Sequence, residues 1–160
     1  MKTSKQNRWL HAACATLLLA AMGTAQAQTY KLNLPQEDDP DTVLQSITVS
    51  PKQTRVTLLL KNSEPGDYEV CVHQPGSPDA FTLKVLDTGE SLQQISSSGV
   101  SNCEVKRDIV RTGKRKTFQL TFPPLPAGAT RLQLGERDCQ TNPDTELQNW
   151  CFKDIALRKR

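Results

Sequence analysis

The residue best suited to acid–base catalysis in this sequence is His73. It is the only histidine after residue 27, so a Ser-His-Asp triad would have to use it. No G-x-S-x-G segment accompanies it, and it stands two residues after Cys71. Paired carboxylates for glycoside hydrolysis are defined by distance in space, and no local pattern singles out a pair. These observations favour a surface histidine at the end of a strand, and we expect no catalytic residue.

Four cysteines follow residue 27, namely Cys71, Cys103, Cys139 and Cys151. No two of them have C-x2-C spacing, which argues against a zinc site and against dithiol redox chemistry. We therefore expect neither a metal nor a cofactor. An even number of cysteines in an exported chain predicts two disulfides, for which the sequence permits three connectivities. We favour Cys139–Cys151, whose short loop would contribute about 3 kcal/mol, with Cys71–Cys103 as the remaining pair.

The segment 103–117 is rich in basic side chains. One interpretation is a surface that attracts an acidic protein or a polyanionic glycan. The other, which we favour, is a solvated hairpin tip whose charges prevent aggregation at a sheet edge. Aromatic side chains interleaved with the charges, as in sites for single-stranded nucleic acid, are missing. The candidate binding residues are Lys106, Arg107, Arg111, Lys114, Arg115 and Lys116, which Arg158, Lys159 and Arg160 could extend.

Two other segments have compositions that suggest ligands. The acidic "EDDPD" (37–41) lacks the spacing of an EF-hand, so we interpret it as an acidic loop rather than a calcium site. The segment "FPPLP" (122–126) contains Pro123 and Pro126 in PxxP spacing. Such motifs dock into SH3 or WW grooves mainly inside cells, and proline cannot donate to a strand ladder. We therefore predict a structural corner between two strands.

Residues 1–27 have the pattern of a secretory signal peptide. Three basic residues precede a mostly apolar run at 9–22, and "AQA" (25–27) provides small residues for cleavage. Cleavage predicts an exported protein, periplasmic or extracellular, without a transmembrane anchor. It would leave 133 residues with 17 basic and 17 acidic side chains, so the charge does not support a nucleic-acid partner. The length predicts one domain, with an N-terminal segment and acidic loop at 28–42 and a β-sandwich at 43–160.

Apolar and polar residues alternate between turn residues along most of the chain, which is typical of β-strands. Hairpins are predicted at 43–61, at 81–95 and, around Thr112-Gly113-Lys114, at 103–122. Further strands are predicted at 30–34, 67–74, 130–136 and 150–157, and a polar loop at 96–102. A phase slip between Phe152 and Ile155 predicts a β-bulge. About eight or nine short strands predict an all-β fold, an antiparallel β-sandwich of immunoglobulin type.

Three segments together resemble a known module: "SITVSPKQTRVTLLLKN", "TFQLTFPPLPAGATRLQLGE" and "NWCFKDIAL". In this β-sandwich module of exported bacterial proteins, a TFxLxFPPLP segment precedes a strand ending in Gly-Glu, and a Trp-x-Phe-x-x-Ile strand ends the domain. The resemblance covers residues 43–157. It implies an immunoglobulin-like fold and brings no catalytic residue with it. Cys139 and Cys151 are not part of the module's pattern.

These observations predict an exported, disulfide-bonded module that binds another protein or an envelope component and is not an enzyme. The sequence leaves the oligomeric state open. An alternative is an inhibitor or immunity-type protein whose loop 137–149, held by Cys139 and Cys151, blocks the active site of a hydrolase or toxin. A hydrolase is the second alternative.

Overall fold

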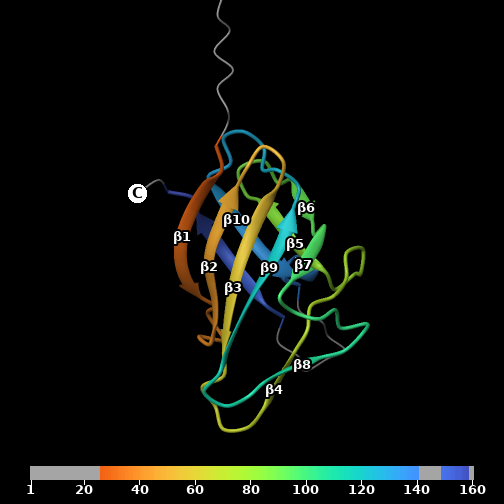
Figure 1. Cartoon of the computed structure of the whole chain (residues 1–160). Helices are drawn as coiled ribbons and strands as arrows, with labels where there is room; N and C mark the ends of the chain where they lie inside the picture. The colour runs from red at the N-terminus through yellow and green to blue at the C-terminus, as the bar shows by residue number, and fades with distance from the viewer. Residues whose placement is uncertain (1–25, 141–148, 159–160) are drawn as a thin grey trace, which may run out of the picture.

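The computed structural model describes residues 26–140 and 149–158, which form eleven strands in three sheets (Figure 1). All pairings between these strands are antiparallel, which confirms the predicted all-β class. The strands are more numerous than the eight or nine expected. Residues 1–25 of the predicted signal peptide, residues 141–148 of the predicted inhibitory loop, and Lys159 and Arg160 lie outside the described residues.

The largest sheet has five strands in the order β1-β2-β3-β9-β7. These strands are β1 (Gln28–Pro35), β2 (Thr42–Val49), β3 (Thr54–Lys61), β9 (Arg115–Phe122) and β7 (Ser96–Ser98). The predicted hairpin at 43–61 is confirmed as β2 and β3, with Ser50 and Gln53 hydrogen-bonded across the turn. The predicted loop at 96–102 is wrong in its first half, because β7 pairs with β9. Its three serines show no apolar alternation, so the pattern could not reveal this strand.

The second sheet has four strands in the order β11-β10-β5-β6. These strands are β11 (Cys151–Ala156), β10 (Arg131–Glu136), β5 (Phe81–Val85) and β6 (Ser91–Gln93). The predicted hairpin at 81–95 is confirmed by the pairing of β5 with β6. The predicted bulge is also confirmed: Leu132 lies opposite Ile155 but Leu134 lies opposite Phe152, which leaves one extra residue on β11.

The third sheet is a short ribbon of β4 (Tyr68–Val70) and β8 (Asp108–Val110). The hairpin predicted at 103–122 is therefore wrong, because β8 pairs with β4 whereas β9 pairs with β3 and β7. The turn itself exists: Gly113 has φ of +73°, and its N–H donates to the Asn62 carbonyl at 2.7 Å. It leads the chain from the ribbon into the five-stranded sheet instead of folding it back.

The two larger sheets face each other, and the core fills the space between them (Figure 1). The apolar faces of β3, β9 and β10 point into this core, since Leu58, Phe118 and Leu132 are at most 1% exposed. Trp150 stacks on Phe118 with ring centroids 5.5 Å apart. Burial of each such side chain contributes about 1.5–3 kcal/mol. Tyr68 at the start of β4 is 44% exposed, although Val70 on the same face of that strand is buried.

The immunoglobulin-like strand order is not confirmed. In an immunoglobulin domain of constant type no more than two consecutive strands share a sheet, whereas β1, β2 and β3 lie side by side here. The proline segment 123–126 connects β9 to β10, which lie in different sheets. The Leu125 N–H donates to the Thr54 hydroxyl at 3.1 Å, which holds this crossing against β3. The segment is a structural corner, as expected.

Both expected disulfides are present, as Cys71–Cys103 and Cys139–Cys151. The first joins the residue after β4 to the segment before β8, beside a bridge between Val72 and Asn102. The second joins the first residue of β11 to the short 3-10 turn η1 (Arg137–Cys139). All three η1 residues have left-handed φ angles, between 49° and 61°. Within the described residues no helix is long and apolar enough to cross a bilayer.

Candidate functional site: a basic groove beside a two-stranded ribbon

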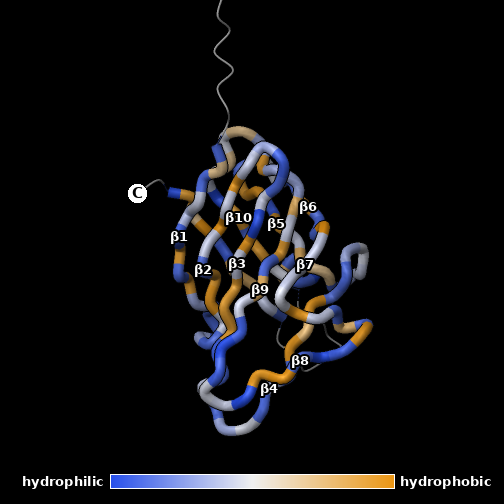
Figure 2. The backbone as a smooth tube through the Cα atoms, viewed as in Figure 1, coloured by the Kyte–Doolittle hydropathy of each residue, from blue (hydrophilic) through white to orange (hydrophobic). Residues whose placement is uncertain are grey.

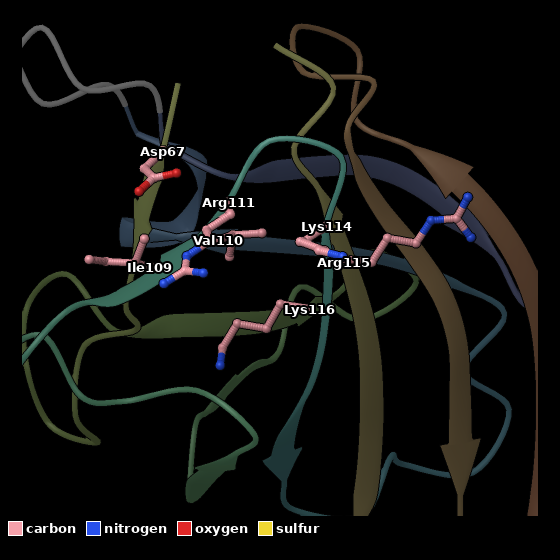
Figure 3. A pocket seen from close by; sticks show the side chains of 7 residues that line it. All are labelled: Asp67, Ile109, Val110, Arg111, Lys114, Arg115 and Lys116. Carbon is pink, nitrogen blue, oxygen red and sulfur yellow. The ribbon is translucent and has the colours of Figure 1, made fainter. Parts of the chain in front are cut away.

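The candidate site is a groove of about 460 Å³ between β8 and the start of β9, which we call the basic groove. Figure 3 shows the residues that line it: Asp67, Ile109, Val110, Arg111, Lys114, Arg115 and Lys116. Four of the six predicted binding residues thus come together. Lys106 and Arg107 do not line the groove, and Arg107 instead pairs with Glu69 at 3.2 Å. Nor does Arg158, which lies near Asp154: the hydrogen bond from Arg131 and, to a smaller extent, the charge of Arg158 lower the pKa of Asp154.

Asn62 fixes the wall of the basic groove. This residue is only 6% exposed and follows the last residue of β3. Its side-chain amide donates to the carbonyls of Val110 at 2.7 Å and Gly66 at 2.8 Å. Its backbone N–H donates to the Lys114 carbonyl, and its own carbonyl accepts from Gly113. Because buried amides are costly unless satisfied, these four bonds hold both sides of the 111–114 turn in one position.

The cations of the groove differ in how they are compensated. The Lys116 ammonium lies 3.1 Å from a carboxylate oxygen of Asp108, and both side chains are mostly buried. The Ser101 N–H and hydroxyl donate to this carboxylate at 2.9 and 2.8 Å. The bonds from Ser101 and then the charge of Lys116 lower the pKa of Asp108 to about 2. At physiological pH the ionised Asp108 therefore compensates the positive charge of Lys116.

The remaining cations, Arg111, Lys114 and Arg115, make no salt bridge within the described part of the chain. Among the described residues, Asp67 is the only acidic one that lines the basic groove. Arg111 and Lys116 extend on the same side of the groove, whereas Arg115 extends away from them (Figure 3). The groove consequently carries uncompensated positive charge, which would favour an anionic ligand.

The groove also has an apolar component. Ile109 lines it and is 62% exposed. Its partner across the ribbon is Glu69, while Val110 and Val70 are buried. Figure 2 shows apolar stretches in the ribbon of β4 and β8. This ribbon lies at the opposite end of the molecule from the beginning of β1 (Figure 2). An exposed aliphatic side chain among cations suits a ligand that combines negative charge with an apolar group.

A second pocket, of about 380 Å³, has four acidic residues among the ten that line it, and we call it the acidic pocket. Its lining residues are Asp38, Asp39, Pro40, Asp41, Leu60, Lys61, Asn62, Glu64, Tyr68 and Trp150. Asp39 and Asp41 organise the predicted acidic loop: Asp39 accepts from Asp41 and Thr42, and Asp41 accepts from the N–H and hydroxyl of Ser63. Burial, together with the charges of Asp39 and Glu136, raises the pKa of Tyr68.

His73 contacts a carboxylate but is not part of a triad in the described residues. Its Nδ1 lies 3.0 Å from a carboxylate oxygen of Glu104, and the Gln74 N–H also donates to Glu104. The His73 carbonyl accepts from the side chain of Gln94. These contacts hold the segment next to the Cys71–Cys103 disulfide. Within 26–140 and 149–158, no three His, Cys, Asp or Glu side chains are grouped to hold a metal ion.

Glu136 at the end of β10 titrates near neutrality. Burial raises its pKa to about 7, although the Trp150 N–H donates to its carboxylate at 3.2 Å. The sequence contains no sign of this shift, because it arises from the burial of the carboxyl group in the folded chain.

No protein-family model matches this chain, and no curated protein or solved structure matches it either. The resemblance to a module of exported bacterial proteins is therefore supported only as far as its all-β antiparallel architecture.

Proposed function

We propose that this chain is an exported, non-catalytic binding module whose basic groove receives an acidic segment of another protein. The observation that carries the proposal is that Arg111 and Lys114, which line the groove with the exposed Ile109, have no acidic partner among the described residues. Groove residues that are held by the Asn62 hydrogen bonds lose little freedom on binding, which favours affinity.

An acidic protein segment fits the groove better than a polyanionic glycan. A protein segment carries aliphatic side chains that can cover Ile109, whereas a sulfated or carboxylated sugar does not. Asp67 would also repel a uniformly anionic polymer but can pair with a cation in a mixed protein segment. The volume of about 460 Å³ falls within the usual range of ligand sites. Because exposed ion pairs contribute only about 0.2–1 kcal/mol each, we expect weak, salt-sensitive binding.

Binding of a fluorescent peptide of alternating Glu and Leu, followed by anisotropy, tests the proposal. We expect the R111E/K114E variant to bind at least about tenfold more weakly than the wild type. K106E/R107E is the matched control, because it changes the net charge equally outside the groove, and we expect a change of less than about threefold. Equal losses in both variants would show that only overall charge matters. Binding of dextran sulfate but not of the peptide would refute the proposed partner class.

The same proposal includes two further points. The protein is exported, and its two facing sheets form an immunoglobulin-like β-sandwich. The two disulfides support export, because such bonds persist in oxidising compartments. N-terminal sequencing of the mature protein should begin at Gln28, and a start at Met1 would refute cleavage after residue 27.

The inhibitor alternative has one supporting observation. Three consecutive left-handed residues, Arg137 to Cys139, are held by the disulfide to Cys151 and by ion pairs of Arg137 with Asp79 and Asp138 with Lys84. Inhibitory loops are commonly rigid in this way. The tip of the loop lies outside the described residues, so this function stays a prediction. The hydrolase alternative also stays a prediction. A preparation of the mature protein can test both, by inhibition of envelope hydrolases and by turnover of generic ester and glycoside substrates.

A further inference from the structure

We infer that two copies of this chain associate, with the basic groove of each copy against the acidic pocket of the other. The inference rests on the proposed function, since it uses the same groove as a binding site. It adds a partner of definite chemistry, namely the acidic pocket of a second copy.

The two pockets are lined by neighbouring segments of the fold. Tyr68, which lines the acidic pocket, lies directly opposite Val110, which lines the basic groove, in the register of the β4–β8 ribbon. Asn62 lines the acidic pocket and hydrogen-bonds to Val110 and Lys114 in the wall of the groove. The two sites are thus held at a fixed distance by the same backbone elements.

Their charges are complementary. In the acidic pocket Asp38 and Glu64 make no hydrogen bond or salt bridge with other described residues, and Lys61 is the only cation that lines it. In the basic groove Arg111 and Lys114 are similarly uncompensated. The chain after residue 27 has equal numbers of basic and acidic residues, so two copies do not repel one another through net charge.

A surface with opposite charges side by side can be complementary to itself. In a two-fold dimer each residue i contacts j while j contacts i, so two groove-to-pocket contacts form at once. The exposed apolar residues Ile109 and Tyr68, one at each site, would be covered in such a contact. The expected interface is small and polar and therefore weak and sensitive to salt.

Sedimentation velocity of the mature, oxidised protein tests the inference. From about 1 to about 200 µM we expect the dimer fraction to rise at about 50 mM NaCl and to vanish at about 500 mM. The test uses two charge-reversal variants, R111E/K114E and D38K/E64K. The replaced side chains make no hydrogen bond or salt bridge to other described residues, so we expect both variants to fold. We expect each variant alone to be monomeric, and a 1:1 mixture to restore the dimer, because each reversed site then meets a complementary one. K106E/R107E is the control and should dimerise like the wild type.

A wild type that stays monomeric at every concentration at low salt would overturn the inference. So would variants that dimerise as well as the wild type, or a mixture that does not recover. The peptide titration tests the proposed function separately from dimer formation. It is done at about 1 µM protein, where we expect the chain to be monomeric. Peptide binding without self-association refutes only the dimer, whereas loss of both refutes the groove as a site.

Discussion

Replacement of Asp108 by Asn will destabilise the fold by about 2 kcal/mol near neutral pH. Asp108 uses both carboxylate oxygens to accept from Ser101, and one of them also faces Lys116. An amide has one acceptor oxygen and would place its NH2 group against one of these donors. The pKa of Asp108 is lowered from 3.8 to about 2, and each unit corresponds to about 1.4 kcal/mol, so the upper limit is about 2.5 kcal/mol. The side chains of Asp108 and Lys116 are 18% and 25% exposed, so solvent screening places the expected loss below this limit.

The effect must depend on pH with a definite sign. A carboxyl group whose pKa is lowered by folding stabilises the fold above its unfolded pKa and loses this effect as the pH falls through its folded pKa. For Asp108 the difference between wild type and variant should be constant above about pH 5 and should disappear below about pH 2. Urea unfolding followed by the fluorescence of Trp150, the only tryptophan after residue 27, measures this difference.

Asp67→Asn is the matched control for this experiment, because Asp67 is exposed at the same groove and makes no described hydrogen bond or salt bridge. It should change stability by less than about 0.5 kcal/mol. The reasoning is refuted if Asp108→Asn costs nothing near pH 7. It is also refuted if the cost is equal near pH 7 and below pH 2, because the loss would then come from packing rather than charge.

Other predictions concern the turn η1, Glu136 and a glycine. The C139S/C151S variant should lose about 3 kcal/mol in urea unfolding while keeping the β-sheet circular dichroism spectrum; an unchanged midpoint would show that the disulfide adds no stability. Because burial raises the pKa of Glu136 to about 7, its ionisation destabilises the fold as the pH rises from about 4.5 through 7. Glu136→Gln should therefore be more stable than the wild type by about 1–3 kcal/mol near pH 8 and by less near pH 5, which thermal unfolding at both pH values checks. Gly99→Ala should cost more than Gly89→Ala in the same assay, because both have positive φ but only at Gly99 would a Cβ lie 2.8 Å from the Thr117 carbonyl oxygen; equal costs would contradict the steric argument.

The strands that bury one face were predictable because alternation reports burial directly. Val56 and Leu58 in β3 and Phe118 and Leu120 in β9 alternate with polar residues and point inward. The cysteine pairing followed from parity and loop length. The polar strand β7 escaped prediction because it buries no apolar side chain.

Strand partners were less predictable than strands. The turn at Gly113 was correctly placed, yet β8 pairs with β4 across about 40 residues rather than with the neighbouring β9. Two distant contacts favour this partner, the Cys71–Cys103 disulfide and the bridge from Val72 to Asn102. Neither contact leaves a local pattern in the sequence.

The candidate site was predictable in its charges but not in its geometry. Four of the six basic residues line the groove, but the pairing of Lys116 with Asp108 and of Arg107 with Glu69 depends on the fold. Ile109 was missed because an exposed isoleucine in a short strand resembles any other strand residue. The acidic pocket was missed because its residues come from separate segments, such as 38–41, 60–64 and Trp150.

The central claim is that the basic groove, and not the charge of the chain as a whole, is the binding site. Chemical-shift mapping of the backbone amides during titration with the Glu–Leu peptide tests it most directly. The largest changes should fall on Asp67 and on residues 109–116, with little change at Lys106 and Arg107. Changes concentrated elsewhere, or spread evenly over all surface cations, would contradict the claim.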